Sequence, residues 1–220
     1  MIASRPASVY RQGAILIAPI SIAVFAFGVT FGVLARSAGM GSIAAIVMSA
    51  TTFAGSAQFA AASILGAAGG TATAIAAALL LNARYVPIGI SVAAGFEGGF
   101  VRRLLAAQLV VDESWAVASR RGFDFRILVG AGVVLYAAWN LGTALGVVGG
   151  GALGNPKRLG LDAAFPALFL ALLVPQLRSR RSWAAAAIAA SIAFVLIPLT
   201  RPGIPIVAAS AACLIGWRRP

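Results

Sequence analysis

Polar side chains interrupt the long apolar runs of this chain at four places. They are AGSAQ at 54–58, NARY at 82–85, Asp112 with Glu113, and Asp162 with Pro166. Within hydrocarbon, a buried polar group that lacks a partner is costly, so each of these groups needs a partner or a cavity. Intramembrane carboxylates commonly bind a cation, an ammonium group or a proton. The clusters therefore indicate a binding site at membrane depth.

The first cluster has two interpretations. Small residues such as Gly55 and Ser56 allow helices to pack closely, and Ser or Gln can hydrogen bond across the interface. Alternatively, the helix is interrupted near the bilayer midplane, and its N-terminal end favours an anion such as a carboxylate. Gln58 fits packing less well, because a packed interface must satisfy the donors and the acceptor of its amide. Composition leaves both interpretations open.

The second cluster predicts one broken helix. Arg84 is an isolated charge that either faces a cavity or a partner, or lies at a helix end and extends to the membrane surface. The sequence stays apolar beyond it, and Pro87 removes a backbone hydrogen bond just after it. We therefore expect a polar break at Asn82–Arg84, with Arg84 in the site or paired with an intramembrane carboxylate.

The acidic clusters also have plain alternatives. Asp112 and Glu113 are two of only five acidic residues, and a cytoplasmic loop would place them near arginines. However, apolar residues and Trp115 flank them, which is unusual for a solvated loop. Asp162 is explained most simply as a helix N-cap. Pro166, in the same run, predicts a kink that protein or a cavity must cover.

Several classes of function are excluded by what the chain lacks. It has no His and one cysteine, Cys213, which disfavours a metal centre and a disulfide. It also has no nucleotide-binding, metalloprotease or serine-hydrolase motif, so we expect no enzyme, no cofactor and no metal. The formal net charge is +12, but the arginines lie between apolar segments. That is the distribution of cytoplasmic membrane anchors, so we expect no nucleic-acid partner.

The elements that must position these residues are transmembrane helices. The chain is 61% hydrophobic and 10% charged, with a mean hydropathy of +0.98. These values predict an all-α, polytopic bundle in the lipid bilayer, forming a single membrane domain over 1–220. About seven spans are expected, within a range of six to eight, some of them broken. Their predicted ranges are 14–35, 42–67, 71–92, 127–149, 160–177, 184–200 and 203–217.

The order of the spans predicts part of the topology. The arginine-rich segments 120–126 and 178–183 should face the cytoplasm, as should the C-terminus. The side of the N-terminus depends on 104–119, which is short for a span and is a candidate re-entrant or slanting helix. If 104–119 crosses, the N-terminus is cytoplasmic. If it does not, the N-terminus lies outside.

A weak internal repeat bears on the architecture. AFGVTFGVLA at 26–35 resembles WNLGTALGVVG at 139–149. The implied units are 14–92 and 127–200, joined by a polar, partly embedded segment at 93–126. Chance similarity of alanine-rich helices is the alternative. An inverted repeat would be the architecture of many secondary transporters.

Four segments, in this order, resemble the AzlC family, the large subunit of bacterial branched-chain amino acid exporters. They are FAGSAQF at 53–59, NARYVPIGIS at 82–91, VDES at 111–114 and LDAAFPALFLALL at 161–173. The resemblance implies a bacterial inner-membrane protein that exports valine, leucine or isoleucine. It also implies a small AzlD-type membrane subunit as partner. The chain departs from the family at Tyr85 and Val111, where members often have His and Thr.

We therefore interpret the chain as an amino acid exporter. The hypothesis places backbone amides and Arg84 on the substrate carboxylate, an acidic residue on its ammonium, and Phe53 or Phe59 against its side chain. The predicted substrate-binding residues are Gly55, Ser56, Gln58, Asn82, Arg84, Asp112 and Glu113, and Asp162, Pro166 and Pro87 are assigned to coupling or helix breaks. The alternative is a membrane-embedded scaffold subunit without its own substrate site, which the many small residues favour and the charged clusters disfavour.

Overall fold

The computed structural model describes residues 6–120, 122–150, 170, 173–174 and 177–216, and every regular element among them is helical. The candidate residues Asp162 and Pro166 lie outside this described part. The principal helices are α1 (Pro6–Ser37), α2 (Ser42–Thr52), α3 (Gly55–Gly66), α4 (Thr71–Asn82), α5 (Tyr85–Val92), α6 (Phe100–Ala107), α7 (Asp112–Ser119), α8 (Phe125–Gly149), α10 (Arg180–Leu196) and α11 (Ile204–Ala209). Short 3₁₀ turns, η1 (Ala93–Gly95) and η4 (Ser210–Gly216), follow α5 and α11.

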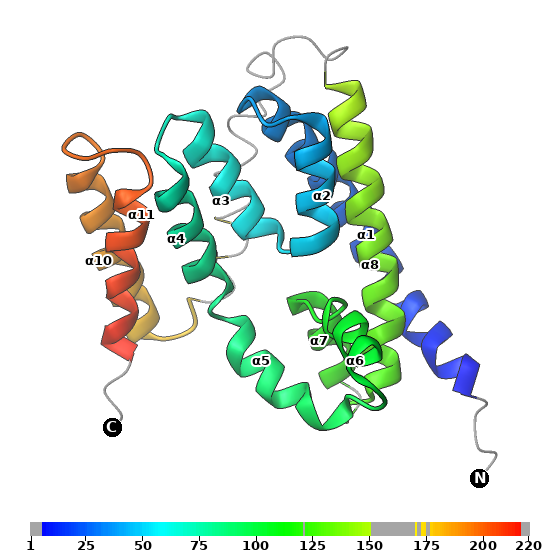
Figure 1. Cartoon of the computed structure of the whole chain (residues 1–220). Helices are drawn as coiled ribbons and strands as arrows, with labels where there is room; N and C mark the ends of the chain where they lie inside the picture. The colour runs from blue at the N-terminus through cyan, green and yellow to red at the C-terminus, as the bar shows by residue number, and fades with distance from the viewer. Residues whose placement is uncertain (1–5, 121, 151–169, 171–172, 175–176, 217–220) are drawn as a thin grey trace.

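Two long helices, α1 and α8, run side by side in the same direction (Figure 1). Both are long and apolar enough to cross a membrane. Glycines form the contact: Gly28 faces Gly142, and Gly32 faces Gly146. A Cβ on any of these glycines would collide with a backbone carbonyl oxygen of the other helix. Close backbone approach through small residues is a common way for helices to associate in lipid.

The run predicted as one span over 42–67 is instead a hairpin of two short helices. α2 descends from the upper end of the molecule to mid-height, and α3 returns upward beside α4 (Figure 1). The turn forms at Phe53, which adopts left-handed dihedral angles (φ 41, ψ 49) and ends α2. At about 1.5 Å per residue, each arm measures roughly 16–18 Å, which is too short to cross about 30 Å of hydrocarbon.

The next span is broken as the sequence suggests. α4 and α5 meet at an angle of 43° and together meet the criteria for one bent span. The bend lies at Ala83–Arg84, one turn before Pro87. Proline has no N–H with which to bond the Ala83 carbonyl, and its ring crowds that carbonyl, so a straight helix cannot continue here.

A second hairpin of short helices rises from the lower end (Figure 1). α6 ends at mid-height, the chain turns at 108–111, and α7 descends against α8. Each helix has eight residues, or roughly 12 Å, so neither is long enough to cross a membrane by itself. Together, the two hairpins and the bent span place three helix interruptions at the same height.

The expected total of about seven spans is not confirmed. Within the described residues, two helices are long and apolar enough to span a membrane, or three if the bent pair counts as one. α10 has 17 residues and α11 has six, and the predicted span at 160–177 lies largely outside the described part. The prediction was based on the length of the apolar runs. An apolar run has the same length whether it crosses the membrane or turns back at mid-height.

The direction of the helices does not fit an inverted repeat. The equivalent first helices of the two predicted units are α1 and α8, and an inverted repeat requires them to be antiparallel. They are parallel, and two candidate spans, α1 and the bent α4–α5 pair, precede α8. This arrangement fits repeats related by an axis along the membrane normal. The repeat units 14–92 and 127–200 themselves stay a prediction, since much of the second lies outside the described residues.

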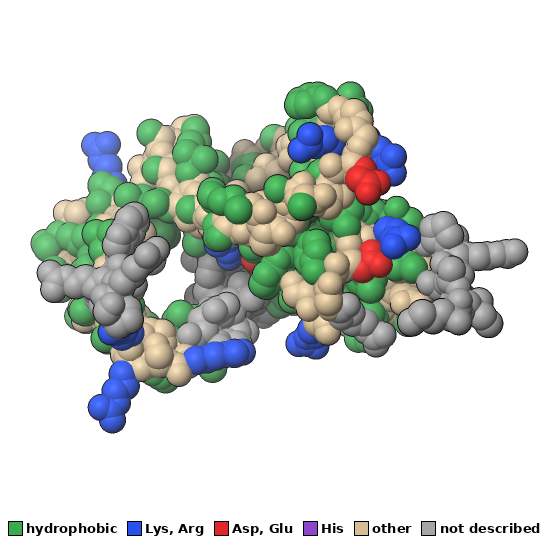
Figure 2. All heavy atoms as spheres, turned by 90° about the horizontal axis from the view of Figure 1, so that it is seen from below, with side chains coloured by type: hydrophobic (Ala, Val, Ile, Leu, Met, Phe, Trp, Pro, Cys, Tyr) green, Lys and Arg blue, Asp and Glu red, His purple; other side chains and the backbone are tan. Residues whose placement is uncertain are grey.

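Basic side chains gather at the lower end of the molecule. Figure 2 shows this face, with arginines spread around its edge. Exposed arginines lie at the element ends on this side, namely the starts of α1, α6, α8 and α10 and the end of α7 (Figure 1). These are Arg11, Arg102, Arg103, Arg120, Arg126, Arg178, Arg180 and Arg181. We call this side the basic end.

Candidate functional site

The three helix interruptions converge on one cavity of about 140 Å³, which we call the central cavity. Gly55 and Ser56 reach it from the start of α3, and Arg84 reaches it from the α4–α5 bend. Asp112 and Glu113 reach it from the start of α7. Five of the residues predicted from three separate sequence clusters therefore share one site.

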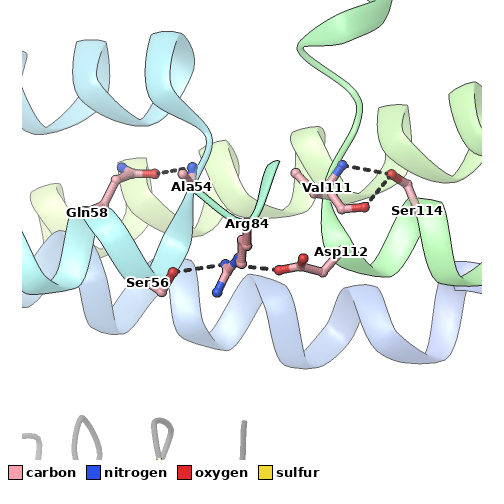
Figure 3. Close-up of polar contacts among 7 residues, drawn as sticks. All are labelled: Ala54, Ser56, Gln58, Arg84, Val111, Asp112 and Ser114. Carbon is pink, nitrogen blue, oxygen red and sulfur yellow. Dashed lines mark hydrogen bonds and ion pairs between the residues drawn. The ribbon is translucent and has the colours of Figure 1, made fainter. Parts of the chain in front are cut away.

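Arg84 connects the elements that meet in this site. Its Nη2 donates a hydrogen bond to the Ser56 hydroxyl at 2.9 Å and forms an ion pair with Asp112 Oδ2, also at 2.9 Å (Figure 3). About 40% of each charged side chain is exposed, at 38% for Arg84 and 41% for Asp112. The Nε atom of Arg84 is buried and has no hydrogen-bond partner. The guanidinium thus has donor capacity beyond its present contacts.

The starts of α3 and α7 both border the cavity but differ in charge. The first turn of α7 carries Asp112 and Glu113, which complement the positive end of that helix dipole. The first turn of α3 has no acidic residue, and no side chain caps it. Free backbone N–H groups at such an end attract an anion. The cavity therefore has a side that favours a carboxylate and a side that favours a cation.

Apolar side chains form the rest of the wall. Phe53 and Phe59, predicted as wall residues, both line the cavity. α1 adds Val24 and Phe27, and α8 adds Leu135 and Trp139. Phe59 and Trp139 meet edge to face, with ring centroids 6.0 Å apart. These residues give the polar groups an adjoining apolar surface.

Gln58 does not line the central cavity. It is fully buried on the other side of α3, and its amide accepts a hydrogen bond from the Ala54 N–H at 3.1 Å (Figure 3). The same amide donates to the Ser49 hydroxyl at 3.1 Å. Gln58 therefore satisfies backbone and side-chain groups around the α2–α3 turn.

Ser49, on α2, is the centre of a buried network that the sequence reasoning missed. It accepts hydrogen bonds from Gln58 and, at 3.0 Å, from the indole N–H of Trp139. A hydroxyl accepts two hydrogen bonds and donates one, so its own proton goes to Thr143, 2.8 Å away. The signal was present: Ser49, Trp139 and Thr143 carry polar groups within apolar runs.

The remaining predicted residues lie apart from the central cavity. Asn82 lines a neighbouring cavity of about 300 Å³, and its Oδ1 atom is buried without a partner. Pro87 is exposed on α5 and acts on the backbone rather than on the cavity. Asp162 and Pro166 are outside the described residues, so their predicted roles stay predictions.

Comparison with known proteins assigns the chain to a family. Residues 19–153 match the family described as AzlC protein. An "Uncharacterized membrane protein" of Archaeoglobus fulgidus is 33% identical over 96% of this chain and 95% of its own length. The "Branched-chain amino acid transport protein AzlC" of Bacillus subtilis is 28% identical over 72% of this chain and 65% of its own length.

No solved structure matches the chain significantly. The family match covers more than half of the residues, and the archaeal relative is similar over nearly the whole length. The protein is therefore a transport-related membrane protein that belongs to the AzlC family.

Proposed function

We propose that the protein is a secondary transporter that exports branched-chain or other small hydrophobic amino acids across the bacterial inner membrane. The observation that carries the proposal is the charge pattern of the central cavity. One cation, Arg84, lies between an uncapped helix N-terminus and the carboxylate of Asp112, beside an apolar wall. A zwitterion with an apolar side chain complements all three surfaces.

The proposed pose follows from these contacts. The substrate carboxylate binds Arg84 and the free N–H groups at the start of α3, where Ser56 lies. Its ammonium binds Asp112 or Glu113 at the start of α7. In this pose the substrate replaces the internal ion pair between Arg84 and Asp112, so both charges keep a partner.

The volume of the central cavity supports a small substrate. At about 140 Å³ it is well below the range of roughly 300–1,000 Å³ that is typical of pockets for drug-sized ligands. Phe59 and Trp139 offer the apolar surface that a branched side chain needs. A dipeptide or a larger solute would require the site to widen.

The membrane orientation is part of the proposal. The arginines of the basic end are expected to face the cytoplasm, because short cytoplasmic loops carry an excess of Lys and Arg. This orientation places the start of α1 and the end of η4 on the cytoplasmic side (Figure 1). A small AzlD-type membrane subunit is the proposed partner.

One observation favours the alternative of a scaffold subunit. The glycine contact between α1 and α8 shows that much of the small-residue content serves helix packing. Reconstitution separates the two functions. The chain should transport labelled valine into proteoliposomes, alone or with its small subunit, and central-cavity variants should abolish the flux. If those variants leave the flux unchanged, the result would support the scaffold function.

The sharpest test removes each charge of the central pair. In cells loaded with an isoleucine-containing dipeptide, Arg84→Gln and Asp112→Asn should each lower isoleucine efflux about tenfold or more, because each leaves a charge unpaired at depth. The matched controls are Arg126→Gln and Asp124→Asn, which alter the exposed ion pair at the start of α8. At equal expression the controls should transport normally. Normal efflux by both central variants would refute the proposed site.

A further inference from the structure

Three cavities lie in series from the basic end, and the central cavity is the innermost of them. The outer cavity, of about 480 Å³, is lined by Phe100, Arg103 and Leu104 of α6. The intermediate cavity, of about 300 Å³, is lined by Asn82, Gly89 and Gln108, among others. The outer and intermediate cavities share Phe96 and Ala107 as lining residues. The intermediate and central cavities share Phe53 and Tyr85.

The order of these cavities follows the height of the molecule. The outer cavity is lined by residues of α6 near its start, and α6 starts at the basic end (Figure 1). The central cavity is lined by residues at the helix interruptions, which lie at mid-height. The intermediate cavity extends along α5 between them. The cavities therefore adjoin one another, with Phe53 and Tyr85 between the central and intermediate cavities and Phe96 and Ala107 between the intermediate and outer ones.

The two side chains at the inner wall, Phe53 and Tyr85, differ in what holds them. Phe53 has a left-handed backbone at the end of α2, and its ring meets Tyr136 edge to face at 5.1 Å. Tyr85 begins α5 directly after the bend, and its side chain hydrogen bonds to that of Arg84. Its ring lies 5.2 Å from the Arg84 guanidinium carbon. Phe53 is therefore fixed by the backbone and by Tyr136, whereas the position of Tyr85 depends on that of Arg84, the proposed substrate-binding cation.

We propose that Tyr85 is the gate between the central cavity and a solute pathway that opens at the basic end. The pathway rests on the cavities alone, while the identity of the solute rests on the proposed function. When a carboxylate binds Arg84, the guanidinium shifts from Asp112, and the adjacent ring of Tyr85 shifts with it. Occupancy of the site and the position of the gate are thereby coupled through neighbouring residues.

The lining of the intermediate cavity suits the passage of a zwitterion. The amide oxygen of Asn82 has no hydrogen-bond partner, and no charged side chain among the described residues lines this cavity. Neutral polar groups hold a zwitterion weakly, so it can enter and leave. A charged wall would trap one end of the solute.

Cysteine accessibility tests the gate in the full-length chain. The natural Cys213 is first replaced by Ser, so that each introduced thiol is unique. Ala23→Cys reports on the central cavity, and Gly89→Cys reports on the intermediate cavity. Each is made with Tyr85 intact, with Tyr85→Ala, and with Tyr85→Phe, which keeps the ring. A membrane-impermeant thiol reagent is added to inside-out and right-side-out bacterial vesicles.

The expected result is specific to the position behind the gate. From the cytoplasmic side, Tyr85→Ala should raise the labelling rate of Ala23→Cys at least about tenfold, a shift of about 1.4 kcal/mol in the opening equilibrium. Tyr85→Phe should label like the parent, and Gly89→Cys should label equally in all three backgrounds. Equal labelling of Ala23→Cys in all three, or faster labelling from the opposite side, would overturn the gate.

Substrate protection separates this inference from the proposed function. Isoleucine at saturating concentration should slow the labelling of Ala23→Cys in the Tyr85→Ala background but not the labelling of Gly89→Cys. If Tyr85→Ala accelerates labelling and isoleucine gives no protection, the pathway stands and the proposed substrate fails. If isoleucine protects in the intact protein but Tyr85→Ala changes nothing, the substrate stands and the gate fails.

Discussion

Arg84 occupies a position where one side chain touches three structural elements. A single nitrogen, Nη2, serves both the Ser56 hydroxyl and the Asp112 carboxylate, while Nε is buried without a partner. A guanidinium offers several N–H donors in a planar fork, so it can begin to bind a second carboxylate before it releases the first. This spare capacity distinguishes Arg84 from an arginine that only holds two helices together.

Gln58 and Ser56 should give opposite phenotypes although they are two residues apart. Gln58→Ala leaves the Ala54 N–H without its partner and is expected to lower the free energy of unfolding by about 1–3 kcal/mol. Ser56→Ala should leave stability nearly unchanged and reduce isoleucine efflux a few fold. Thermal unfolding in detergent and efflux at equal amounts of folded protein measure the two effects. Weak efflux by stable Gln58→Ala protein would instead place Gln58 on the substrate.

At the scale of elements, each helix interruption has a local cause. Phe53 ends α2 in a left-handed conformation, which is uncommon for a residue other than glycine. Pro87 prevents a straight α4–α5 helix. At 108–111, the Gln108 amide donates to the Ala50 and Thr51 carbonyls at the end of α2, which ties one hairpin tip to the other. The interruptions are thus stabilised by contacts and not merely tolerated.

The glycine contact between α1 and α8 should not tolerate added side-chain volume. Gly146→Ala places a methyl group against the Val29 carbonyl and should cost about 1–3 kcal/mol or more. Gly149→Ala, one turn further along α8, meets nothing within 4 Å and is the matched control. The yield of monodisperse protein after detergent extraction measures the difference. Equal yields would show that the two helices can separate without harm.

The interruptions were partly predictable from sequence. Polar residues inside apolar runs pointed to Gly55, Ser56, Arg84, Asp112 and Glu113, and the pairing of Arg84 with an intramembrane carboxylate follows from the cost of burying a lone charge. Gln58 was grouped with Ser56 because they are close in sequence. On a helix of 3.6 residues per turn, residues two apart lie about 200° apart, so they face opposite sides.

At the scale of the whole molecule, the distribution of charge and the direction of the helices agree. Arginines collect at the end where α1, α8 and α10 start, and few lie at the other end within the described residues (Figures 1 and 2). The two-hairpin topology could not be read from hydropathy, because an apolar hairpin and an apolar span have the same composition. Only the backbone shows where the chain turns back.

Both ends of the chain are expected on the cytoplasmic side. Alkaline phosphatase, which is active only outside the inner membrane, should be inactive when fused after residue 216 and active when inserted in the turn at 67–70 between α3 and α4. A green fluorescent protein fused before α1 should be fluorescent. An extracytoplasmic N-terminus would contradict this orientation. The sequence predicted that side for a non-crossing 104–119 only because 42–67 was counted as a span, and 42–67 forms a hairpin.

The glycine contact between α1 and α8 has a self-complementary geometry. Gly28 contacts the backbone of Trp139, Gly142 and Thr143, and Gly142 contacts the backbone of Phe25, Gly28 and Val29. Each contact is matched by its counterpart with the two helices exchanged, which is the isologous relation of a two-fold dimer. One chain therefore contains an interface that two identical half-length chains would form. A fragment that ends after α5 carries one of the two matched sets of glycines, Gly28 and Gly32.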